Sequence, residues 1–369
     1  MPTAPRRCVV GCGLTTVTYR LPVVALIVAG AMSFALALLL TPVLIRLLRK
    51  RGIGQPIHDD LQHHTQKAGT PTIGGVVAPL SLLTAFPVAL VVSGHLPSRL
   101  GVAAAVTVVA MGGVGLLDDG MKVFRERNLG LRERQKTVLQ TLVSLGYALT
   151  VLASQGSCRQ LAFTNCQHAV LNVPSWMYVV VFMAVFWGST NAVNFTDGIE
   201  GLLAGAAAVT FLVLTGIGFW VFRHPRIYEV PHALEFALVS ACLAGSMCGL
   251  LWWNVSPMTI FMGDTGSLAL GAGLVVICSG LGLTLLVPVI GVLYVGVGAS
   301  SFLQRVWFKW TRRRGTPRRL FRMAPIHHHF ELVGWSESTI VVRFWIVNAI
   351  AAGFAVLLFY GDALRYLPT

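Results

Sequence analysis

Charged residues are scarce in this sequence of 369 residues. Asp, Glu, Lys and Arg make up only 11 % of it, whereas hydrophobic residues make up 55 %. A soluble domain carries about 25 % charged residues, so the composition excludes a soluble enzyme built around one large core. Length alone would allow two or three soluble domains, but the long uncharged runs predict a single unit embedded in a membrane.

Cysteine is also sparse, and its spacing does not suggest a metal site. Of the seven cysteines, Cys242, Cys248 and Cys278 fall inside apolar runs, which is typical of small core residues. No arrangement resembles the two closely spaced pairs of a structural zinc site. Cys158 and Cys166 share one polar loop, and they could form a disulfide if that loop lies outside the cell.

Uncharged runs long enough to cross a bilayer recur along the chain. A membrane helix needs about 20 apolar residues, and such runs begin at Leu21, Thr70, Leu100, Thr137, Val173, Gly201, Phe236 and Phe344. The stretch 265–304 has no charge and would form about 60 Å of helix, twice a bilayer core. A break is therefore predicted near Gly282–Pro288. The sequence predicts an all-α integral membrane protein, a bundle of ten transmembrane helices.

The distribution of basic residues predicts the orientation of this bundle. The loops after the odd-numbered spans hold 20 of the 28 Lys and Arg residues, and the positive-inside rule places such loops in the cytoplasm. Both termini would then lie outside, with tails at 1–20 and 362–369 flanking one domain at 21–361. The same assignment places 11 of the 14 acids on the cytoplasmic face. Because acids contribute little to orientation, their gathering separately indicates a site there.

The net charge of +14 does not by itself predict nucleic-acid binding. The basic residues are scattered over the loops between apolar runs. Lys and Arg in such loops set topology and meet anionic lipids or substrate phosphates. The run from Arg312 to Arg319 is interpreted in this way, as a contact with lipid headgroups rather than a catalytic element.

Two adjacent acids, Asp118 and Asp119, end the third predicted span. Like charges this close resist ionisation unless a cation offsets them. Mg²⁺ prefers oxygen ligands and usually takes one or two carboxylates together with substrate phosphates. Lys122 would share the same helix face. The pair therefore predicts a magnesium and phosphate site, although a helix end that simply reaches water remains an alternative.

A second polar cluster, Asn-Phe-Thr-Asp-Gly-Ile-Glu-Gly, lies between the fifth and sixth spans. Asn194, Asp197 and Glu200 offer donors and acceptors, while Gly198 and Gly201 allow a backbone to approach a ligand. Acids at a membrane border are functional candidates. A tight turn between two helices is the alternative interpretation.

A third cluster, from Asn254 to Ser267, precedes the eighth span. Asp264 lies between two glycines at the predicted start of that helix, and a helix N-terminus attracts anions. Asp264 could therefore share a metal with a phosphate. It could also act as the N-cap of its own helix, and the two roles are compatible.

The segment that enters the second span adds a weaker signal. Lys67, Thr70 and Thr72 supply a lysine, two hydroxyls and an exposed backbone on the same face. Gly and Pro nearby are also common at any helix start, so this segment alone predicts little.

Three adjacent histidines, His327, His328 and His329, lie in the last cytoplasmic loop. Neighbouring residues do not all face one metal, and the helical zinc signature needs two histidines four residues apart. We expect a phosphate-binding or substrate-binding role, and a solvated loop remains the alternative.

These motifs together resemble the phospho-N-acetylmuramoyl-pentapeptide transferase family, within the polyprenyl-phosphate N-acetylhexosamine-1-phosphate transferase superfamily. The resemblance covers the chain from Leu21 to Tyr360. The acid pair, the segment 194–200 and Asp264 carry the likeness to the superfamily. Gly-Thr-Pro-Thr-Ile-Gly-Gly at 69–75 and Met-Ala-Pro-Ile-His-His-His-Phe-Glu-Leu at 323–332 carry the likeness to the family.

The resemblance implies a reaction and a set of roles. Phospho-N-acetylmuramoyl-pentapeptide would pass from its UDP carrier to undecaprenyl phosphate, with Mg²⁺ bound by Asp264, at the cytoplasmic face of a bacterial inner membrane. Asp118 and Asp119 would be catalytic acids near the lipid phosphate, and Phe261 would stack on the uracil. A homodimer is also implied. Further substrate-binding residues would be Lys67, Thr72, Lys122, Lys136, Asn194, Asp197, Glu200, Asn254, His327, His328 and His329.

Some questions stay open at this point. The family usually has Asp where this chain has Glu200, whose side chain is one methylene longer. A related superfamily transferase that uses UDP-N-acetylglucosamine is one alternative, against which the string at 323–332 argues. A secondary transporter is an alternative of another class, but no internal repeat of the kind that such proteins contain is evident.

Overall fold

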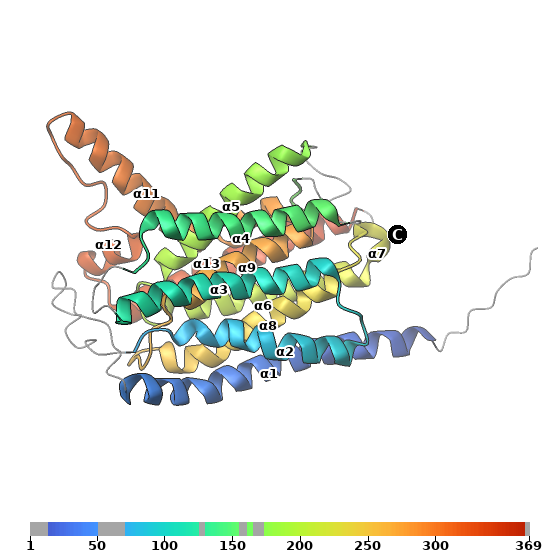
Figure 1. The fold of residues 1–369 in the computed structure, drawn as a ribbon. Coiled ribbons are helices and arrows are strands. Elements are labelled where there is room, and N and C mark those ends of the chain that lie inside the picture. Colours follow the sequence, from blue (N-terminus) through green and yellow to red (C-terminus); the bar gives the residue numbers. More distant parts are fainter. Residues whose placement is uncertain (1–13, 51–70, 125–129, 155–160, 165–172, 366–369) are drawn as a thin grey trace, which may run out of the picture.

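The computed structural model describes residues 14–50, 71–124, 130–154, 161–164 and 173–365, and these residues form helices without a strand (Figure 1). Lys67, Cys158 and Cys166 lie outside them. The helices of more than four residues are α1 (Leu14–Lys50), α2 (Val77–Ser93), α3 (Arg99–Phe124), α4 (Glu133–Ala153), α5 (Ser175–Thr196), α6 (Leu202–Arg223), α8 (Ala233–Asn254), α9 (Gly263–Gly280), α11 (Val292–Arg313), α12 (Ile326–Val333) and α13 (Glu337–Ala363).

The apolar runs form the long helices. Within the described residues, nine helices are long and apolar enough to cross a membrane, and one bent pair brings the number to ten. Helices form there because, in lipid, each backbone N–H and C=O must be paired within its own segment. The prediction of an all-α membrane protein with about ten spans is confirmed.

The predicted break in the long uncharged stretch is also confirmed. After α9 ends at Gly280, the short helices η4 (Thr284–Leu286) and α10 (Val287–Ile290) precede α11. The segment 284–290 and α11 are bent relative to each other by 81°. Because of this bend, α11 leaves the bundle (Figure 1).

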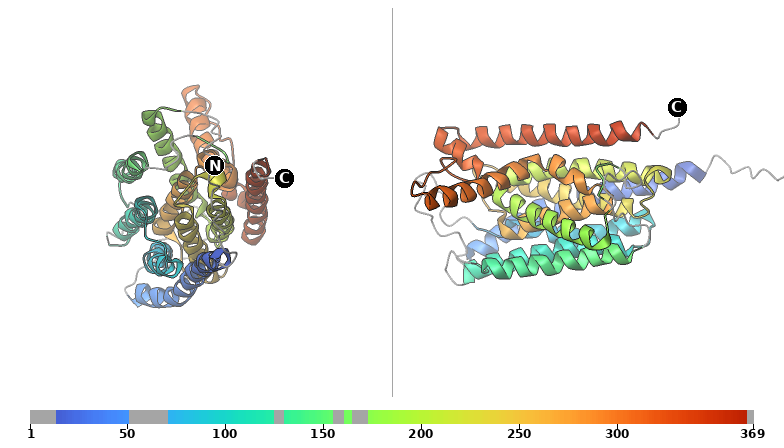
Figure 2. Two further views of the ribbon diagram at one scale, coloured as in Figure 1. Left: turned by 90° about the vertical axis from the view of Figure 1, so that its right-hand side faces the viewer. Right: turned by 90° about the horizontal axis from the view of Figure 1, so that it is seen from above.

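Helices α8 and α9 form the inside of the bundle, and the end-on view in Figure 2 shows other helices around them. α8 packs against α1 and α6, while α9 packs against α3 and α5. Both are almost wholly buried, whereas α1 and α13 are mostly exposed. The exposed apolar side chains of α1 and α13 therefore face the region that lipid would occupy.

Two close helix contacts position the polar end of the bundle. A Cβ on Gly75 would lie 2.3 Å from the Cα of Gly266 on α9. A Cβ on Gly115 of α3 would lie 2.2 Å from the backbone oxygen of Asp264. Small residues allow helix backbones to approach in this way. The glycines thus bring the start of α9 against the end of α3, where the acidic residues lie.

Two short helices were not predicted from the sequence. One is α7 (Pro225–Tyr228), and the other is α12, which contains the three histidines. The histidine string lies in the segment between two long helices, as predicted, but within that segment it forms a short helix. Its apolar residues Ile326 and Phe330, at i and i+4, pack against the core, which favours a helix.

Candidate active site

The end of α3 presents two buried carboxylates and a lysine. Asp118 and Asp119 are each only 3 % exposed. The Nζ atom of Lys122 lies 2.6 Å from Oδ2 of Asp118 and 3.7 Å from Oδ1 of Asp119. Asp118 Oδ1 also accepts a hydrogen bond of 2.8 Å from the backbone N–H of Leu131. These acids do not simply reach water, so the alternative interpretation of this helix end is wrong.

Asp119 caps α9 from another helix. Its carboxylate accepts hydrogen bonds from the backbone N–H groups of Asp264 at 3.2 Å and Thr265 at 2.9 Å. It also accepts one from the hydroxyl of Thr265, at 2.7 Å. The first N–H groups of a helix have no partner within the helix, and Asp119 supplies one. Thr265 was not among the predicted site residues, and nothing local in the sequence indicates this contact.

Asp197 completes the cap. Its Oδ2 accepts a hydrogen bond of 2.9 Å from the backbone N–H of Gly263. Burial raises the pKa of the Asp197 carboxyl to about 7, and the nearby Asp264 and Asp119 also raise it, while the Gly263 N–H opposes the shift. The turn after α5 is therefore tied to the start of α9 by a carboxyl group that releases its proton near neutral pH.

Asp264 is left facing the site because other residues cap its helix. No side chain caps α9 from the N-cap position, Met262, so the alternative role of Asp264 as its own N-cap is not observed. Its Oδ2 lies 2.7 Å from Nζ of Lys136 and 3.2 Å from Nζ of Lys122. Its Oδ1 accepts a hydrogen bond of 2.7 Å from Nδ2 of Asn194. Four elements, α3, α4, α5 and α9, therefore converge on this carboxylate.

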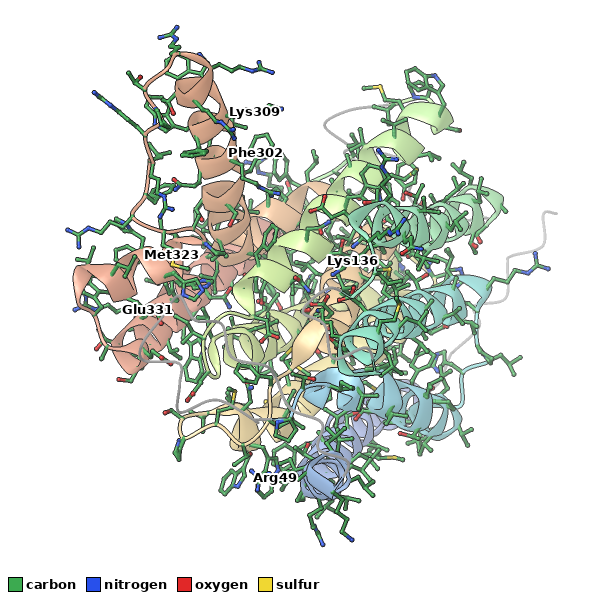
Figure 3. The ribbon with its side chains drawn as sticks, turned by 60° about the vertical axis from the view of Figure 1, so that its left-hand side comes forward. Arg49, Lys136, Phe302, Lys309, Met323 and Glu331 are labelled. Atoms are coloured by element: carbon green, nitrogen blue, oxygen red, sulfur yellow. The ribbon has the colours of Figure 1, made fainter. Side chains whose placement is uncertain are left out.

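The three acids form a group with the chemistry of a metal site. One carboxylate oxygen from each of Asp118, Asp119 and Asp264 lies within 4.8 Å of the others. Oxygen donors of this kind suit Mg²⁺. Lys122 and Lys136 place two positive charges beside them, of which Lys136 lies inside the end of the bundle (Figure 3). Such a site can bind a divalent cation and the phosphates that accompany it.

The segment before α2 joins this site through its backbone. Phe261 donates its N–H to the carbonyl of Pro71, and Gly74 donates its N–H to the carbonyl of Phe261, both at 2.8 Å. Thr72 is thereby held beside Phe261, and it is buried. The backbone here is paired rather than exposed, which corrects one expectation. Thr72 and Phe261 are brought to the same end of the bundle as Asp264.

Asn254 and Glu200 lie one layer away from the acids. Asn254 is buried, donates to the carbonyl of Ile260 at 2.9 Å and accepts from the N–H of Gly201 at 3.2 Å. It therefore braces the turn between α5 and α6 against the segment before α9. Glu200 is also buried and lies within that turn. The structure does not bring either side chain to Asp264 through a hydrogen bond.

The three histidines point to different neighbours. His327 is fully buried against Gly198, where a Cβ would lie 2.3 Å from its Nε2. Neither of its ring nitrogens has a hydrogen-bond partner among the described residues. Burial lowers the pKa of His327 to about 3, and the neighbouring His328 adds to this shift.

The other two histidines are already paired. His328 Nδ1 lies 2.5 Å from Oε2 of Glu331, and His329 Nδ1 accepts the backbone N–H of Arg322 at 3.1 Å. The rings of His328 and His329 therefore face different partners. Through Gly198, the string lies against the turn that carries Asp197.

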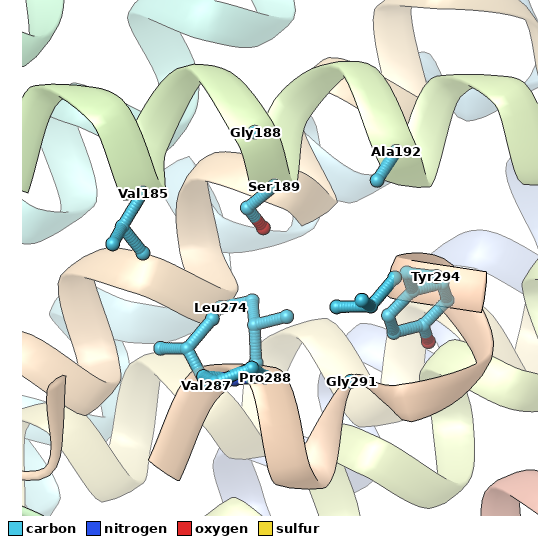
Figure 4. A pocket seen from close by; sticks show the side chains of 10 residues that line it. Val185, Gly188, Ser189, Ala192, Leu274, Val287, Pro288, Gly291 and Tyr294 are labelled. Atoms are coloured by element: carbon cyan, nitrogen blue, oxygen red, sulfur yellow. The ribbon is translucent and has the colours of Figure 1, made fainter. Parts of the chain in front are cut away.

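An apolar cavity of about 190 Å³ lies beside this polar end (Figure 4). Residues of α5, α9, α10 and α11 line it. Ser189 and Ala192 of α5 line it, and they precede Asn194 by five and two residues. The other lining residues are Val185, Gly188, Leu274, Val287, Pro288, Gly291, Tyr294 and Val295.

Comparisons with known proteins identify the family. The family model described as glycosyl transferase family 4 matches residues 101–281, a range that contains all three clustered acids. Proteins named phospho-N-acetylmuramoyl-pentapeptide-transferase are 39 % identical in Mycobacteroides abscessus and 40 % identical in Mycolicibacterium vanbaalenii. Each alignment covers 92 % of this chain and 98 % of the relative. The chain belongs to this transferase family.

The protein of the same name in Saccharopolyspora erythraea is similar to the same extent, at 39 % identity over 358 residues. Because family members are glycosyl transferases by description, the chain is an enzyme, and the transporter alternative has no support. Its apolar helices make it a multi-pass membrane protein.

Proposed function

We propose that this chain transfers phospho-N-acetylmuramoyl-pentapeptide from its UDP carrier to undecaprenyl phosphate and releases UMP. An oxygen of the lipid phosphate would form a bond to the phosphorus that carries the sugar. The bond from that phosphorus to the oxygen of UMP would break. One observation carries the proposal: three clustered carboxylates and two lysines lie at one end of a membrane bundle whose relatives bear this name.

The main physical obstacle is electrostatic, because two polyanions must meet. Phosphoryl transfer requires little covalent work from the protein and depends on positioning and charge. Both ammonium groups, of Lys122 and Lys136, lie within 3.2 Å of Asp264. They are therefore at the place where phosphate oxygens would meet the acids, and they can bind those oxygens. Mg²⁺ held by Asp264, with Asp118 beside it, would supply the further positive charge that phosphate oxygens need. Asp119 is less free to change partners because it caps α9.

Asp118 is the best-placed group for proton transfer or nucleophilic attack. Its Oδ2 contacts Lys122, and its Oδ1 contacts the backbone of Leu131, so the carboxylate is held in one orientation. It could accept a residual proton from the lipid phosphate in a one-step reaction. In a two-step reaction it could instead attack the phosphorus and displace UMP, and an oxygen of the lipid phosphate would then displace the Asp118 oxygen from that phosphorus. Both routes use the same residue in the same place.

The nucleotide sugar would lie against the turn after α5 and the segment before α9. Asn194 contacts Asp264, and Asp197 contacts the start of α9. Thr72 would also meet the nucleotide sugar, and Phe261 would stack on the uracil. His327 has two ring nitrogens without a partner among the described residues, and an unpaired polar group in a buried place is costly unless a ligand or water meets it. Lys67, His328, His329, Asn254 and Glu200 complete the proposed set. Asn254 also braces the turn between α5 and α6.

The lipid tail would use the apolar side of the same region. The cavity beside Asn194 is lined almost entirely by apolar side chains, which suits a short stretch of an isoprenoid chain. On the distribution of basic residues we place the acids at the cytoplasmic face of a bacterial inner membrane and both termini outside. The catalytic unit would span 21–361, and assembly as a homodimer rests on family resemblance alone.

The test is UMP release by purified protein in detergent, with undecaprenyl phosphate and Mg²⁺. Asp264→Asn removes a charge from the clustered acids. The matched control is Asp362→Asn, which removes a charge at the C-terminal end of α13. We expect EDTA and Asp264→Asn to abolish release, and Asp362→Asn to retain it. Release that persists in Asp264→Asn would contradict the proposed metal ligand. UDP-N-acetylglucosamine, used instead of the muramoyl substrate, tests the related transferases.

A further inference from the structure

The last part of α11 projects from the bundle as an arm. We define the arm as residues 302–322, which comprise the end of α11 and the segment that returns toward α12. Figure 1 shows α11 leaving the bundle, and Figure 3 shows Phe302 and Lys309 on the projecting helix. Nearly every residue of the arm is exposed. The arm is not needed to fill the core, so its surface requires another explanation.

The arm is a built structure rather than a loose helix end. Gln304 Oε1 accepts the backbone N–H groups of Leu320 at 3.0 Å and Phe321 at 2.9 Å. Thr311 Oγ1 accepts the N–H of Arg318 at 3.1 Å. These contacts hold the returning segment along one face of the helix. The other faces of the helix therefore stay uncovered by the returning segment.

One of these faces is apolar. Phe302, Val306 and Trp310 follow one another at a spacing of four residues, which places them on one side of the helix. They are 61 %, 50 % and 43 % exposed. Leu303 lies beside them and is also exposed. Trp and Phe on one face of an exposed helix are typical of segments that insert into the boundary between headgroups and acyl chains.

The neighbouring face is basic. Arg305, Lys309 and Arg312 recur at i, i+4 and i+7, next to the apolar stripe. The whole arm has eight Lys and Arg residues and no Asp or Glu. In the part of the chain that the structure describes, no acid forms a salt bridge with any of them. Arg314 instead stacks over the ring of Trp310, 3.8 Å from its centre.

We propose that the arm binds the headgroups of anionic phospholipids. The apolar stripe would enter the acyl boundary while the basic stripe meets the phosphates, which matches how long basic side chains reach the interface. Arginine is well suited because its planar group donates two parallel hydrogen bonds to a phosphate. A soluble anion would use the charges but not the apolar stripe. The two stripes together therefore indicate a lipid.

The experiment measures lipid selectivity of the full chain in bilayers, with spin-labelled phosphatidylglycerol and phosphatidylcholine. The test variant carries Arg305→Gln, Lys309→Gln and Arg312→Gln, which removes the basic stripe. The matched control removes three charges elsewhere, with Arg223→Gln, Arg226→Gln and Arg365→Gln. No nucleotide sugar or Mg²⁺ is added, so failure of the proposed reaction would not affect the result.

We expect the natural chain to prefer phosphatidylglycerol over phosphatidylcholine. In the test variant, the ratio of the two association constants should be at least about fivefold smaller. This is about the contribution of a single basic residue at an anionic surface. A variant with lysine at the same three positions should keep most of the preference, which separates lost charge from misfolding. Equal losses in the test and control variants, or no preference in the natural chain, would overturn the proposal. Displacement by soluble inorganic phosphate would overturn it in favour of a phosphate site.

Discussion

Asp118 and Asp119 are adjacent, yet their contacts predict losses of stability that differ in size when each is replaced by alanine. Asp119→Ala would leave the buried N–H of Thr265 and the partly buried N–H of Asp264, at the start of α9, without their acceptor. Each unsatisfied buried donor costs about 1–3 kcal/mol, so we expect a loss of about 2–6 kcal/mol in stability. Asp118→Ala removes one such acceptor, for the N–H of Leu131, and also relieves repulsion within the acid group. Its loss should be about 1–3 kcal/mol at most.

The assay is thermal unfolding of both variants in the same detergent, followed by UMP release at a temperature where both stay folded. Asp119→Ala should unfold clearly earlier than Asp118→Ala, while Asp118→Ala should be folded and inactive. Asp119→Asn keeps one oxygen acceptor and should lie between Asp119→Ala and the natural chain in stability. Equal unfolding temperatures for the two alanine variants would refute the assignment of Asp119 to the cap of α9.

Three further predictions follow from the site. Gly198→Ala places a Cβ 2.3 Å from Nε2 of His327 and should raise KM for the nucleotide sugar. The control Gly216→Ala, whose Cβ would have nothing within 4 Å, should leave KM unchanged. Equal KM values for the two variants would contradict a role for the contact between Gly198 and His327. The pKa of His327 in the native state, about 3, lies below its value of about 6.5 in the unfolded chain, so the native state binds fewer protons. The contribution of His327 to stability is therefore fully present above about pH 6.5. It falls by about 1.4 kcal/mol per pH unit as the pH is lowered to 3. Between pH 7 and pH 5, the free energy of unfolding of His327→Gln should fall less than that of the natural chain. An equal fall in both proteins would refute the buried, neutral His327. Lys136→Met removes the ammonium 2.7 Å from Asp264 and should lower kcat at least about a hundredfold with little change in folding, so a near-normal kcat would exclude a role for that charge.

The membrane helices could be predicted from the sequence because hydropathy is a local property. The runs that begin at Leu100 and Val173 form α3 and α5, which start one residue before and two residues after those positions. A break near Gly282–Pro288 was predicted because forty uncharged residues are too long for one span. The 81° bend could not be predicted, because its angle depends on packing between α10, α11 and α13.

The acids of the candidate site could be predicted from their position at the edges of apolar runs. Which acid caps α9 and which one faces the site could not be predicted. Asp264 looks like an N-cap in the sequence, yet Asp119 provides the cap from a position 145 residues away. No local pattern reports such a contact. For the same reason, the sequence did not indicate that Asn254 is buried behind the site.

The most direct test of the central claim is the mass of the lipid product. Purified protein is incubated with undecaprenyl phosphate, UDP-N-acetylmuramoyl-pentapeptide and Mg²⁺, and the lipid fraction is analysed by mass spectrometry. The account predicts undecaprenyl diphosphate linked to N-acetylmuramoyl-pentapeptide, formed together with UMP and absent in Asp264→Asn. A lipid that carries N-acetylglucosamine when both sugar nucleotides are present, or no new lipid at all, would contradict it.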